Sequence, residues 1–506
     1  MNILQAKEEI RHSIEAYLMK DDAGQYKIPV LAQRPILLMG PPGIGKTAVM
    51  EQIAKECGVG LVAYTMTHHT RQSAIGLPMI ETHTYGGRQY SATEYTMSEI
   101  IGAVYDTMAR TKKTEGILFL DEINCVSETL APTMLQFLQK KMFGNHRVPD
   151  GWIIVAAGNP PEYNKSVREF DIVTLDRVRR IDITEDFSVW KRYAYERGVH
   201  PSIISYLEIK KDHFYQIETT AAGKRFVTAR GWEDLSYMIY AGELMELPLS
   251  EATVGQYVQH PKIAKDFANY YDLYLQYKDD YHVNEIFDGT IRPQAVEKIR
   301  EARFDEKISL IGLLMGRLNG DFKAQQRHND FVEQLYDVLI ALKELETRDG
   351  EGQTAHPDVQ ENPHIQKADA SAALLSEKID SLDEKENGME IKELYTYLNC
   401  VNAGGSFKDI KTLFEAQVDT LGSLTDAAQA HLNAAFDFME EAFGESQEMV
   451  IFITELNTSS PATRFIGQNG CDRYYKYNEG LLFASGRDRM LQELESITPY
   501  MDFLGI

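Results

Sequence analysis

The sequence has few cysteines and no long apolar run. Only four of its 506 residues are cysteine (Cys57, Cys125, Cys400 and Cys471), and no two of them form a C-x-x-C pair. From this scatter we expect no disulfide framework, no zinc site, and a reducing, cytoplasmic compartment. No apolar segment approaches the roughly 18–20 residues needed to cross a bilayer, so we expect no membrane span.

Positive charge is scarce in the second half of the chain. The whole sequence has 52 Lys and Arg against 76 Asp and Glu, a net charge of −24. Residues 1–245 hold 28 basic and 30 acidic residues, so the other 24 basic and 46 acidic residues give the rest a net charge of −22. This deficit argues against a nucleic-acid track in the second half. It leaves open a solubilising surface or a docking face for a basic or cation-dependent partner.

What the chain does have is a phosphate-binding loop, G-P-P-G-I-G-K-T, at residues 40–47. The loop fits the pattern G-x-x-x-x-G-K-[ST] at every fixed position, between a buried-strand run (Pro35–Met39) and a helical stretch (Ala48–Cys57). Its glycines let successive N–H groups point at a polyphosphate, while Lys46 reaches the outer phosphates and Thr47 can bind Mg²⁺. The residues expected to bind ATP here are Gly40, Pro41, Pro42, Gly43, Ile44, Gly45, Lys46, Thr47 and Ala48.

Two later apolar runs end in polar residues of the kind that hydrolysis needs. Ile117–Leu120 is followed by Asp121, which would hold Mg²⁺ through water, and by Glu122, which would orient and deprotonate the attacking water. Trp152–Ala157 leads to Asn159, whose amide can touch both the γ-phosphate and that water. Nucleotide sites in open α/β sheets lie at the carboxyl ends of the strands. The pattern therefore predicts an ATP-hydrolysing site that uses Mg²⁺.

Arginines at two places in the chain also suit a phosphate. Arg177, Arg179 and Arg180 come just before the strand-like run Ile181–Ile183. They fit either a solvent or nucleic-acid face, or an arginine finger that completes a neighbouring subunit's site. Arg230 falls in the first turn of an expected helix, where the helix dipole disfavours a cation. Its position is easier to explain if it faces an anion.

The rest of the chain is expected to be mainly helical. Residues 70–96 are interpreted as an inserted loop, either moving or packed on the surface, and residues 143–148 as a short β-hairpin. Met449–Ile453 is a lone strand candidate. The predicted parts are an α/β nucleotide-binding core (1–187), a helical lid (188–250), a helical extension (251–346), a flexible linker (347–367) and an acidic, mainly helical C-terminal module (368–506).

Together these motifs resemble the AAA+ ATPases, and within them the MoxR branch of the helix-2-insert group. The matching motifs are G-P-P-G-I-G-K-T (40–47), I-L-F-L-D-E-I (117–123), A-A-G-N-P (156–160), L-D-R (175–177) and T-A-R-G-W (228–232). The resemblance covers about residues 1–250. It implies a five-stranded parallel sheet sandwiched by helices and followed by a small helical lid. It also implies a ring, usually hexameric, with ATP at the subunit interfaces.

The resemblance implies a role for each matching residue. It makes Lys46 and Thr47 the Walker A residues, and Asp121 and Glu122 the Walker B residues. It makes Asn159 sensor 1, Arg177 the arginine finger and Arg230 sensor 2. Arg179 and Arg180 crowd the finger position and keep that assignment open. Ala229 stands where the family more often has a proline before the sensor 2 arginine.

The leading hypothesis is a Mg²⁺-dependent ATPase motor of the MoxR type that remodels or matures a client protein. The resemblance implies a partner with a von Willebrand factor A domain, and the acidic second half is compatible with such docking. One alternative is a nucleic-acid motor, such as a helicase or a restriction-system subunit. Another is a chelatase-type motor subunit that inserts metal into a tetrapyrrole. The presence of Lys46, Asp121 and Glu122 disfavours a non-catalytic ATP-binding scaffold.

Overall fold

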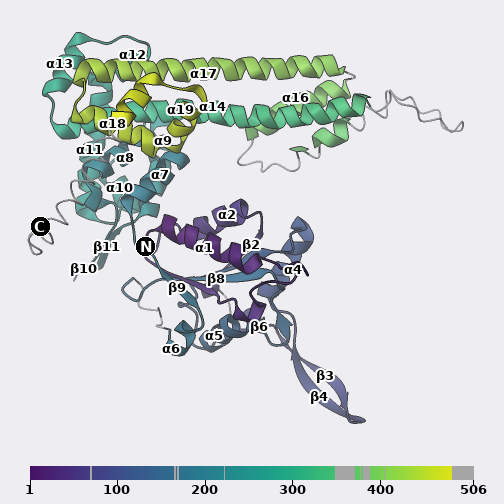
Figure 1. Cartoon of the computed structure of the whole chain (residues 1–506). Coiled ribbons are helices and arrows are strands. Elements are labelled where there is room, and N and C mark those ends of the chain that lie inside the picture. The colour runs from purple at the N-terminus through teal and green to yellow at the C-terminus, as the bar shows by residue number, and fades with distance from the viewer. Residues whose placement is uncertain are drawn as a thin grey trace, which may run out of the picture. The chain divides into compact units, whose positions relative to one another are not determined.

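The chain forms two compact units. The computed structural model describes residues 1–68, 71–163, 167, 170–220, 223–347, 371–376, 378–379, 388–403 and 405–480 (Figure 1). The first unit consists of Met1–Tyr193 and Lys210–Ala268, and the second of Ala194–Ile209 and the described residues from Asn269 on. The predicted flexible linker lies, from residue 348 on, outside the described residues. The bounds of the five predicted parts stay predictions.

The first unit is built on a parallel sheet of five strands in the order β2-β5-β8-β1-β9. The strands are β1 (Ile36–Met39), β2 (Gly60–Thr65), β5 (Gly116–Asp121), β8 (Trp152–Gly158) and β9 (Arg179–Asp182). β1 and β8 are buried along their whole length, as expected of central strands that are covered on both faces. This sheet confirms the predicted fold class.

Helices cover both faces of this sheet. They include α1 (Ile3–Leu18), α2 (Lys46–Glu56), α4 (Glu99–Thr111) and α5 (Ala131–Lys140). Phe119 of β5 shares a core with residues of α1 and α2, whereas its neighbours Leu118 and Leu120 share a core with residues of α4 and α5. This division follows from the two-residue period of a strand, which sends successive side chains to opposite faces.

The indole of Trp152 depends on glycine in the two neighbouring strands. Gly60, Gly116 and Trp152 pair in register across β2, β5 and β8. A methyl group added at Gly116 would lie 2.6 Å from the Trp152 ring, and one added at Gly60 would lie 3.0 Å from it. Trp152 is only 2% exposed, so its ring has no open side toward which to move.

We therefore expect Gly116→Ala to lower the free energy of unfolding by about 1–3 kcal/mol, the usual cost of overpacking a core. Gly102→Ala is the matched control, because Gly102 lies inside α4 with open space around its Cα. Alanine should stabilise that helix by up to about 1 kcal/mol. Urea unfolding of both variants measures the difference, and equal effects would contradict the packing described for Trp152.

The segment expected to be an inserted loop is instead a regular β-hairpin. After α3 (Arg71–Ile75), β3 (Pro78–Tyr85) and β4 (Arg88–Tyr95) pair antiparallel and extend away from the sheet (Figure 1). The loop prediction was wrong because the glycines at 86 and 87 form the hairpin turn, where both have positive φ, and do not break up the flanking strands. The short hairpin expected near residue 145 is confirmed as β6 (Met142–Phe143) and β7 (His146–Arg147).

The remaining elements of the first unit follow the sheet or connect it. Its short 3₁₀ turns are Val30–Ala32, Met66–His68 and Lys211–His213, and its further elements are α6 (Ile172–Leu175), β10 (Gln216–Thr220), β11 (Gly223–Val227), α9 (Ala229–Leu244) and α10 (Glu251–Tyr257). Two helices begin in the first unit and end in the second: α7 (Phe187–Arg197) and α11 (Pro261–Asp280).

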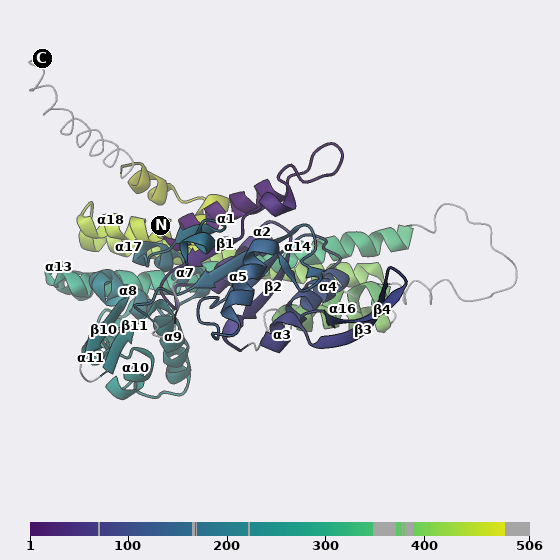
Figure 2. The ribbon, with the colours of Figure 1, turned by 90° about the horizontal axis from the view of Figure 1, so that it is seen from below.

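The second unit is helical, as predicted for the C-terminal region. Its helices are α8 (Pro201–Ile209), α12 (Val283–Phe287), α13 (Pro293–Glu301), α14 (Phe304–Thr347), α16 (Gly388–Asn402), α17 (Phe407–Phe443), α18 (Gln447–Thr458) and α19 (Ser460–Asn469). The two long helices α14 and α17 lie side by side (Figure 1 and Figure 2). Among the residues that the structure describes, no helix combines the length and the apolar composition that crossing a bilayer takes.

The strand predicted at Met449–Ile453 lies within helix α18, so that prediction was wrong. Met449, Phe452 and Ile453 are buried, whereas Val450 is exposed. This spacing of three and four residues is that of a helix face, and it outweighs the strand preference of valine and isoleucine. Ser446 caps the helix by accepting a hydrogen bond from the backbone N–H of Glu448.

Candidate functional site

The phosphate-binding loop connects β1 to α2. β1 ends at Met39 and α2 begins at Lys46, so the loop leads its backbone N–H groups to the N-terminus of a helix. Gly43 and Gly45 have φ angles of +75° and +90°, a region that side chains disfavour. Gly45 is the N-cap of α2 and provides no capping side chain. The first N–H groups of α2 therefore suit an anion.

The predicted catalytic residues converge on this loop from two strand ends. Asn159 directly follows β8, and its Oδ1 accepts a hydrogen bond of 2.8 Å from Lys46 Nζ. Asp121 is the last residue of β5, and its Oδ2 accepts a hydrogen bond of 3.1 Å from Thr47 Oγ1. β5, β8 and β1 are adjacent in the sheet, which explains why residues more than seventy positions apart meet here.

Lys46 is buried among acceptors of its own loop. Its Nζ donates to the carbonyl oxygens of Gly40 and Pro41, at 2.8 and 2.9 Å. Burial lowers the pKa of Lys46 to about 8, and the charges of Asp121 and Glu122 partly oppose this shift. A polyphosphate beside Lys46 would add negative charge and favour the protonated amine.

The two acids at the end of β5 are held differently. Asp121 Oδ1 accepts a hydrogen bond from the backbone N–H of Glu122, at 2.9 Å. Glu122 itself has a φ of +55°, and its Oε2 accepts a hydrogen bond of 2.9 Å from Thr67 Oγ1. The Thr47 hydroxyl and the Asp121 carboxylate are hard oxygen donors of the kind that Mg²⁺ prefers, so these two residues fit a magnesium ion.

Asn124 fixes the position of Asn159, and sequence reasoning missed it. Its Nδ2 donates to the carbonyl oxygen of Asn159 at 2.8 Å, and its Oδ1 accepts from the Asn159 backbone N–H at 3.3 Å. The Asn124 side chain is buried, and both bonds are partly shielded from water. The only signal in the sequence is an amide among the apolar residues that follow Glu122.

We expect Asn124→Ala to lower kcat for ATP hydrolysis at least tenfold and to reduce stability by about 1–3 kcal/mol, because it removes the partner of two partly buried backbone groups of Asn159. Asn124→Asp keeps the shape and the acceptor but sets a carboxylate oxygen against the Asn159 carbonyl in place of the Nδ2 donor, so its effect should be at least as large. Steady-state kinetics at saturating ATP and thermal unfolding separate the two effects. A stable, fully active Asn124→Ala variant would contradict this positioning role.

Two residues that come after β9 in the chain, Tyr215 and Arg230, lie beside the phosphate-binding loop. A methyl group added at Gly43 would lie 3.5 Å from Arg230 Cβ, so the arginine begins next to the loop. Thr228 caps α9 by accepting a hydrogen bond from the backbone N–H of Gly231. The hydroxyl of Tyr215 donates to the Pro42 carbonyl oxygen at 3.0 Å, and burial raises the pKa of this tyrosine. Tyr215 was not predicted from the sequence.

The three clustered arginines have different surroundings. Arg177 is exposed and donates to Gln139 on α5. Arg179 donates to Ser13 and Glu9, both on α1. Among the hydrogen bonds of the described residues, none joins Arg177 to the loop of its own chain. The structure thus brings Lys46, Thr47, Asp121 and Asn159 together, sets Arg230 beside them, and leaves Arg177 on the surface.

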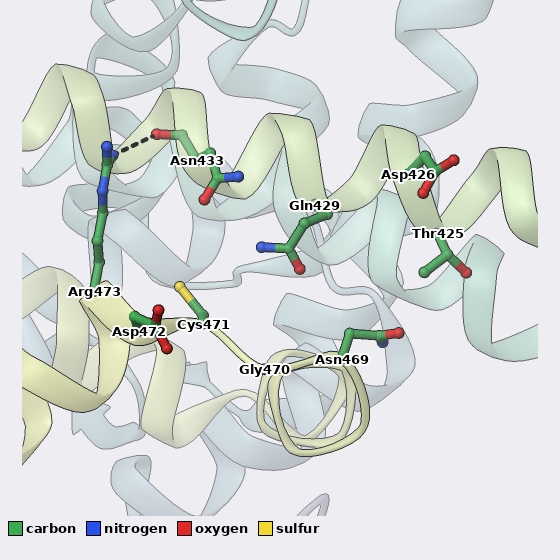
Figure 3. Close-up of a pocket in the computed structure, with 9 residues that line it drawn as sticks. All are labelled: Thr425, Asp426, Gln429, Asn433, Asn469, Gly470, Cys471, Asp472 and Arg473. Atoms are coloured by element: carbon green, nitrogen blue, oxygen red, sulfur yellow. Dashed lines mark hydrogen bonds between the residues drawn. The ribbon is translucent and has the colours of Figure 1, made fainter.

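A separate open pocket of about 560 Å³ lies in the second unit (Figure 3). Its lining residues are Thr425, Asp426, Gln429 and Asn433 of α17, with Asn469, Gly470, Cys471, Asp472 and Arg473 from the end of α19 and the turn that follows. Burial raises the pKa of the Cys471 thiol, which disfavours the reactive thiolate. Arg473 is engaged by Asp437 and by the Asn433 carbonyl oxygen. This pocket has none of the features of the loop site.

The comparison with protein families bears on the loop site. Residues 36–178 match the model described as "ATPase family associated with various cellular activities (AAA)". The match begins at β1 and ends just after Arg177, so it includes the loop and the ends of β5 and β8. A search of curated proteins found no match to the chain. The fold and the family match support an AAA+ ATPase domain within the first unit.

Proposed function

We propose that the chain is a Mg²⁺-dependent ATP hydrolase of the MoxR type, whose turnover drives the remodelling or maturation of a client protein. One observation carries the proposal: Lys46 and Thr47, on a glycine-rich loop at a helix N-terminus, are hydrogen-bonded to Asn159 and Asp121 at neighbouring strand ends. Burying a lysine costs free energy, so a loop with only a structural role would not be expected to bury Lys46 beside these polar residues.

Each residue has a defined task in this proposal. The loop N–H groups and Lys46 bind the outer phosphates, while Thr47 and Asp121 hold a magnesium ion, which neutralises phosphate charge when bound. Glu122 accepts a proton from the attacking water, and Asn159 orients that water against the γ-phosphate. Thr67 holds the Glu122 carboxylate in place until water and nucleotide are bound.

We further propose a ring, hexameric as the resemblance implies, in which Arg177 completes the site of the next subunit. Arg177 is exposed and is held only by Gln139 among its described hydrogen-bond partners. Arg179 is tied to α1 of its own chain, and Arg180 pairs with Asp182. Of the three arginines, these contacts favour Arg177 as the finger. Arg230 would contact the phosphates of its own subunit.

The partner in this proposal is a protein with a von Willebrand factor A domain. The supporting observation is the net charge of −22 on residues 246–506, since the metal-dependent site of such a domain docks acidic side chains. The same charge disfavours a nucleic-acid track.

Hydrolysis of ATP by the purified full-length chain, with Mg²⁺ or with excess EDTA, tests the proposal. We expect turnover that requires Mg²⁺ and does not change when single-stranded or duplex DNA is added. Stimulation by DNA that falls steeply with salt would instead identify a nucleic-acid motor. Tight ATP binding without turnover, even with the partner present, would identify a scaffold.

A further inference from the structure

A second group of metal-ligating side chains lies on the hairpin β3–β4, away from the loop site. Glu81 and His83 are two residues apart on β3, so they share one face of the ribbon. Glu94, on β4, pairs in register with Met79, which puts it on that same face. One ligand atom from each of Glu81, His83 and Glu94 lies within 4.8 Å of the other two. One imidazole and two carboxylates therefore meet on a single surface.

The register of the hairpin explains how Glu94 reaches His83. Glu81 pairs with Ala92, whose small side chain leaves space on the face between Glu94 and the histidine. Glu94 Oε1 lies 3.0 Å from His83 Nε2, which is an ion pair when the imidazole is protonated, but without the geometry of a hydrogen bond. The imidazole stacks on Tyr85, with ring centroids 5.9 Å apart, and this contact fixes the plane of the ring.

His83 Nε2 is a shielded nitrogen that points to a ligand. The atom is inaccessible to solvent and has no hydrogen-bond partner among the described residues. Polar atoms that are cut off from water are almost always satisfied, so one that faces two carboxylates at close range calls for an explanation. A cation bound between the three side chains supplies it, because the imidazole lone pair and both carboxylates would then be coordinated.

We propose that Glu81, His83 and Glu94 bind a divalent transition-metal ion, with Zn²⁺ as the best fit. Imidazole nitrogen with carboxylate oxygen is a ligand set for zinc, whereas Mg²⁺ takes oxygen ligands and keeps its waters. Two ligands at zinc bond lengths in a tetrahedral site are about 3.3 Å apart, close to the separation of His83 Nε2 and Glu94 Oε1. Two carboxylates neutralise the ion, and water completes its coordination.

The ion joins the two strands of an exposed hairpin. Ile80 and Tyr85 on this hairpin are 80% and 61% exposed, so few tertiary contacts hold the ribbon. At its base, His146 of β7 lies 3.0 Å from the Tyr95 carbonyl oxygen through Nε2, which links β4 to the second hairpin. Metal binding therefore stiffens the outer part of a ribbon whose base is already tied to the AAA+ domain.

Zinc binding to the metal-stripped full-length chain tests the inference. We expect isothermal titration calorimetry to show one Zn²⁺ per chain at the hairpin, and we expect His83→Gln and Glu94→Gln each to weaken this binding at least tenfold. His12→Gln, which removes an exposed histidine from α1, is the matched control and should bind as the unaltered chain does. Circular dichroism checks that each variant is folded, since His83 and Glu94 are both half-buried.

Hydrogen exchange locates the ion independently of stoichiometry. Added Zn²⁺ should slow the exchange of backbone amides in residues 78–95 at least tenfold, and this protection should vanish in His83→Gln. Zinc binding that survives in both hairpin variants, or protection confined to other segments, would overturn the inference. So would an affinity weaker than millimolar. Neither measurement depends on ATP turnover.

Discussion

Glu122→Gln should lower kcat for ATP hydrolysis by about 10²–10⁴-fold, the range that a general base contributes. ATP affinity should change little, because in the proposed site Lys46 and Thr47, not Glu122, make the phosphate and magnesium contacts. Glutamine has the size of glutamate and can still accept the hydrogen bond from Thr67, so the shape of the site is kept. What the amide lacks is the ability to take a proton from water.

The control for this variant is Glu51→Gln, which removes an exposed carboxylate from α2, the helix that follows the phosphate-binding loop. Its turnover should stay within about twofold of the unaltered chain, since exposed charges far from the reacting atoms contribute little. Steady-state phosphate release gives kcat, and titration with a fluorescent ATP analogue gives the affinity. If Glu122→Gln turned over at the normal rate, the base would have to be another residue.

Arg177→Ala is expected to lower kcat by about 10³–10⁵-fold in the assembled ring, the range for an arginine finger. In the proposed ring the guanidinium would stabilise charge on the transferred phosphoryl group, and alanine would leave that charge unopposed. The free energy of unfolding should barely change, because an exposed side chain with one hydrogen bond to Gln139 contributes little. A large loss of activity without loss of stability therefore separates a catalytic role from a structural one.

Arg180→Ala is the matched control for the finger. It removes an arginine three residues further on, whose partner is Asp182 of the same chain. Its turnover should stay within a few fold of normal. The opposite ranking of the two variants would move the finger from Arg177 to Arg180, and equal losses would point to a shared basic surface.

The core of the site could be predicted because its chemistry fixes both residue type and spacing. Lys46 and Thr47 belong to a loop with a defined length, and Asp121 and Asn159 each come at the end of an apolar run. Parallel strands bring their carboxyl ends to one edge, so convergence follows from the pattern. Thr67, Asn124 and Tyr215 could not be found in this way. Each acts through one or two hydrogen bonds from a position that no motif defines.

Predictions from local sequence patterns failed where contacts between distant parts of the chain decide the structure. Met449–Ile453 has the composition of a strand, but the burial of Met449, Phe452 and Ile453 on one side makes it a helix. In the β3–β4 hairpin, the two-residue spacing of Glu81 and His83 is visible in the sequence. The position of Glu94 beside these two residues cannot be predicted from the sequence, because it depends on the strand register that pairs Glu81 with Ala92.

Assemblies mixed from two inactive variants test the shared site most directly. Lys46→Ala subunits keep Arg177 but cannot bind the outer phosphates, while Arg177→Ala subunits bind ATP but offer no finger to a neighbour. In a ring mixed at equal ratio, about a quarter of the interfaces pair a working loop with a working finger, and ATP hydrolysis should reappear at those sites. No hydrolysis at any ratio, with co-assembly of the two variants confirmed, would contradict a site completed by Arg177 from the next subunit.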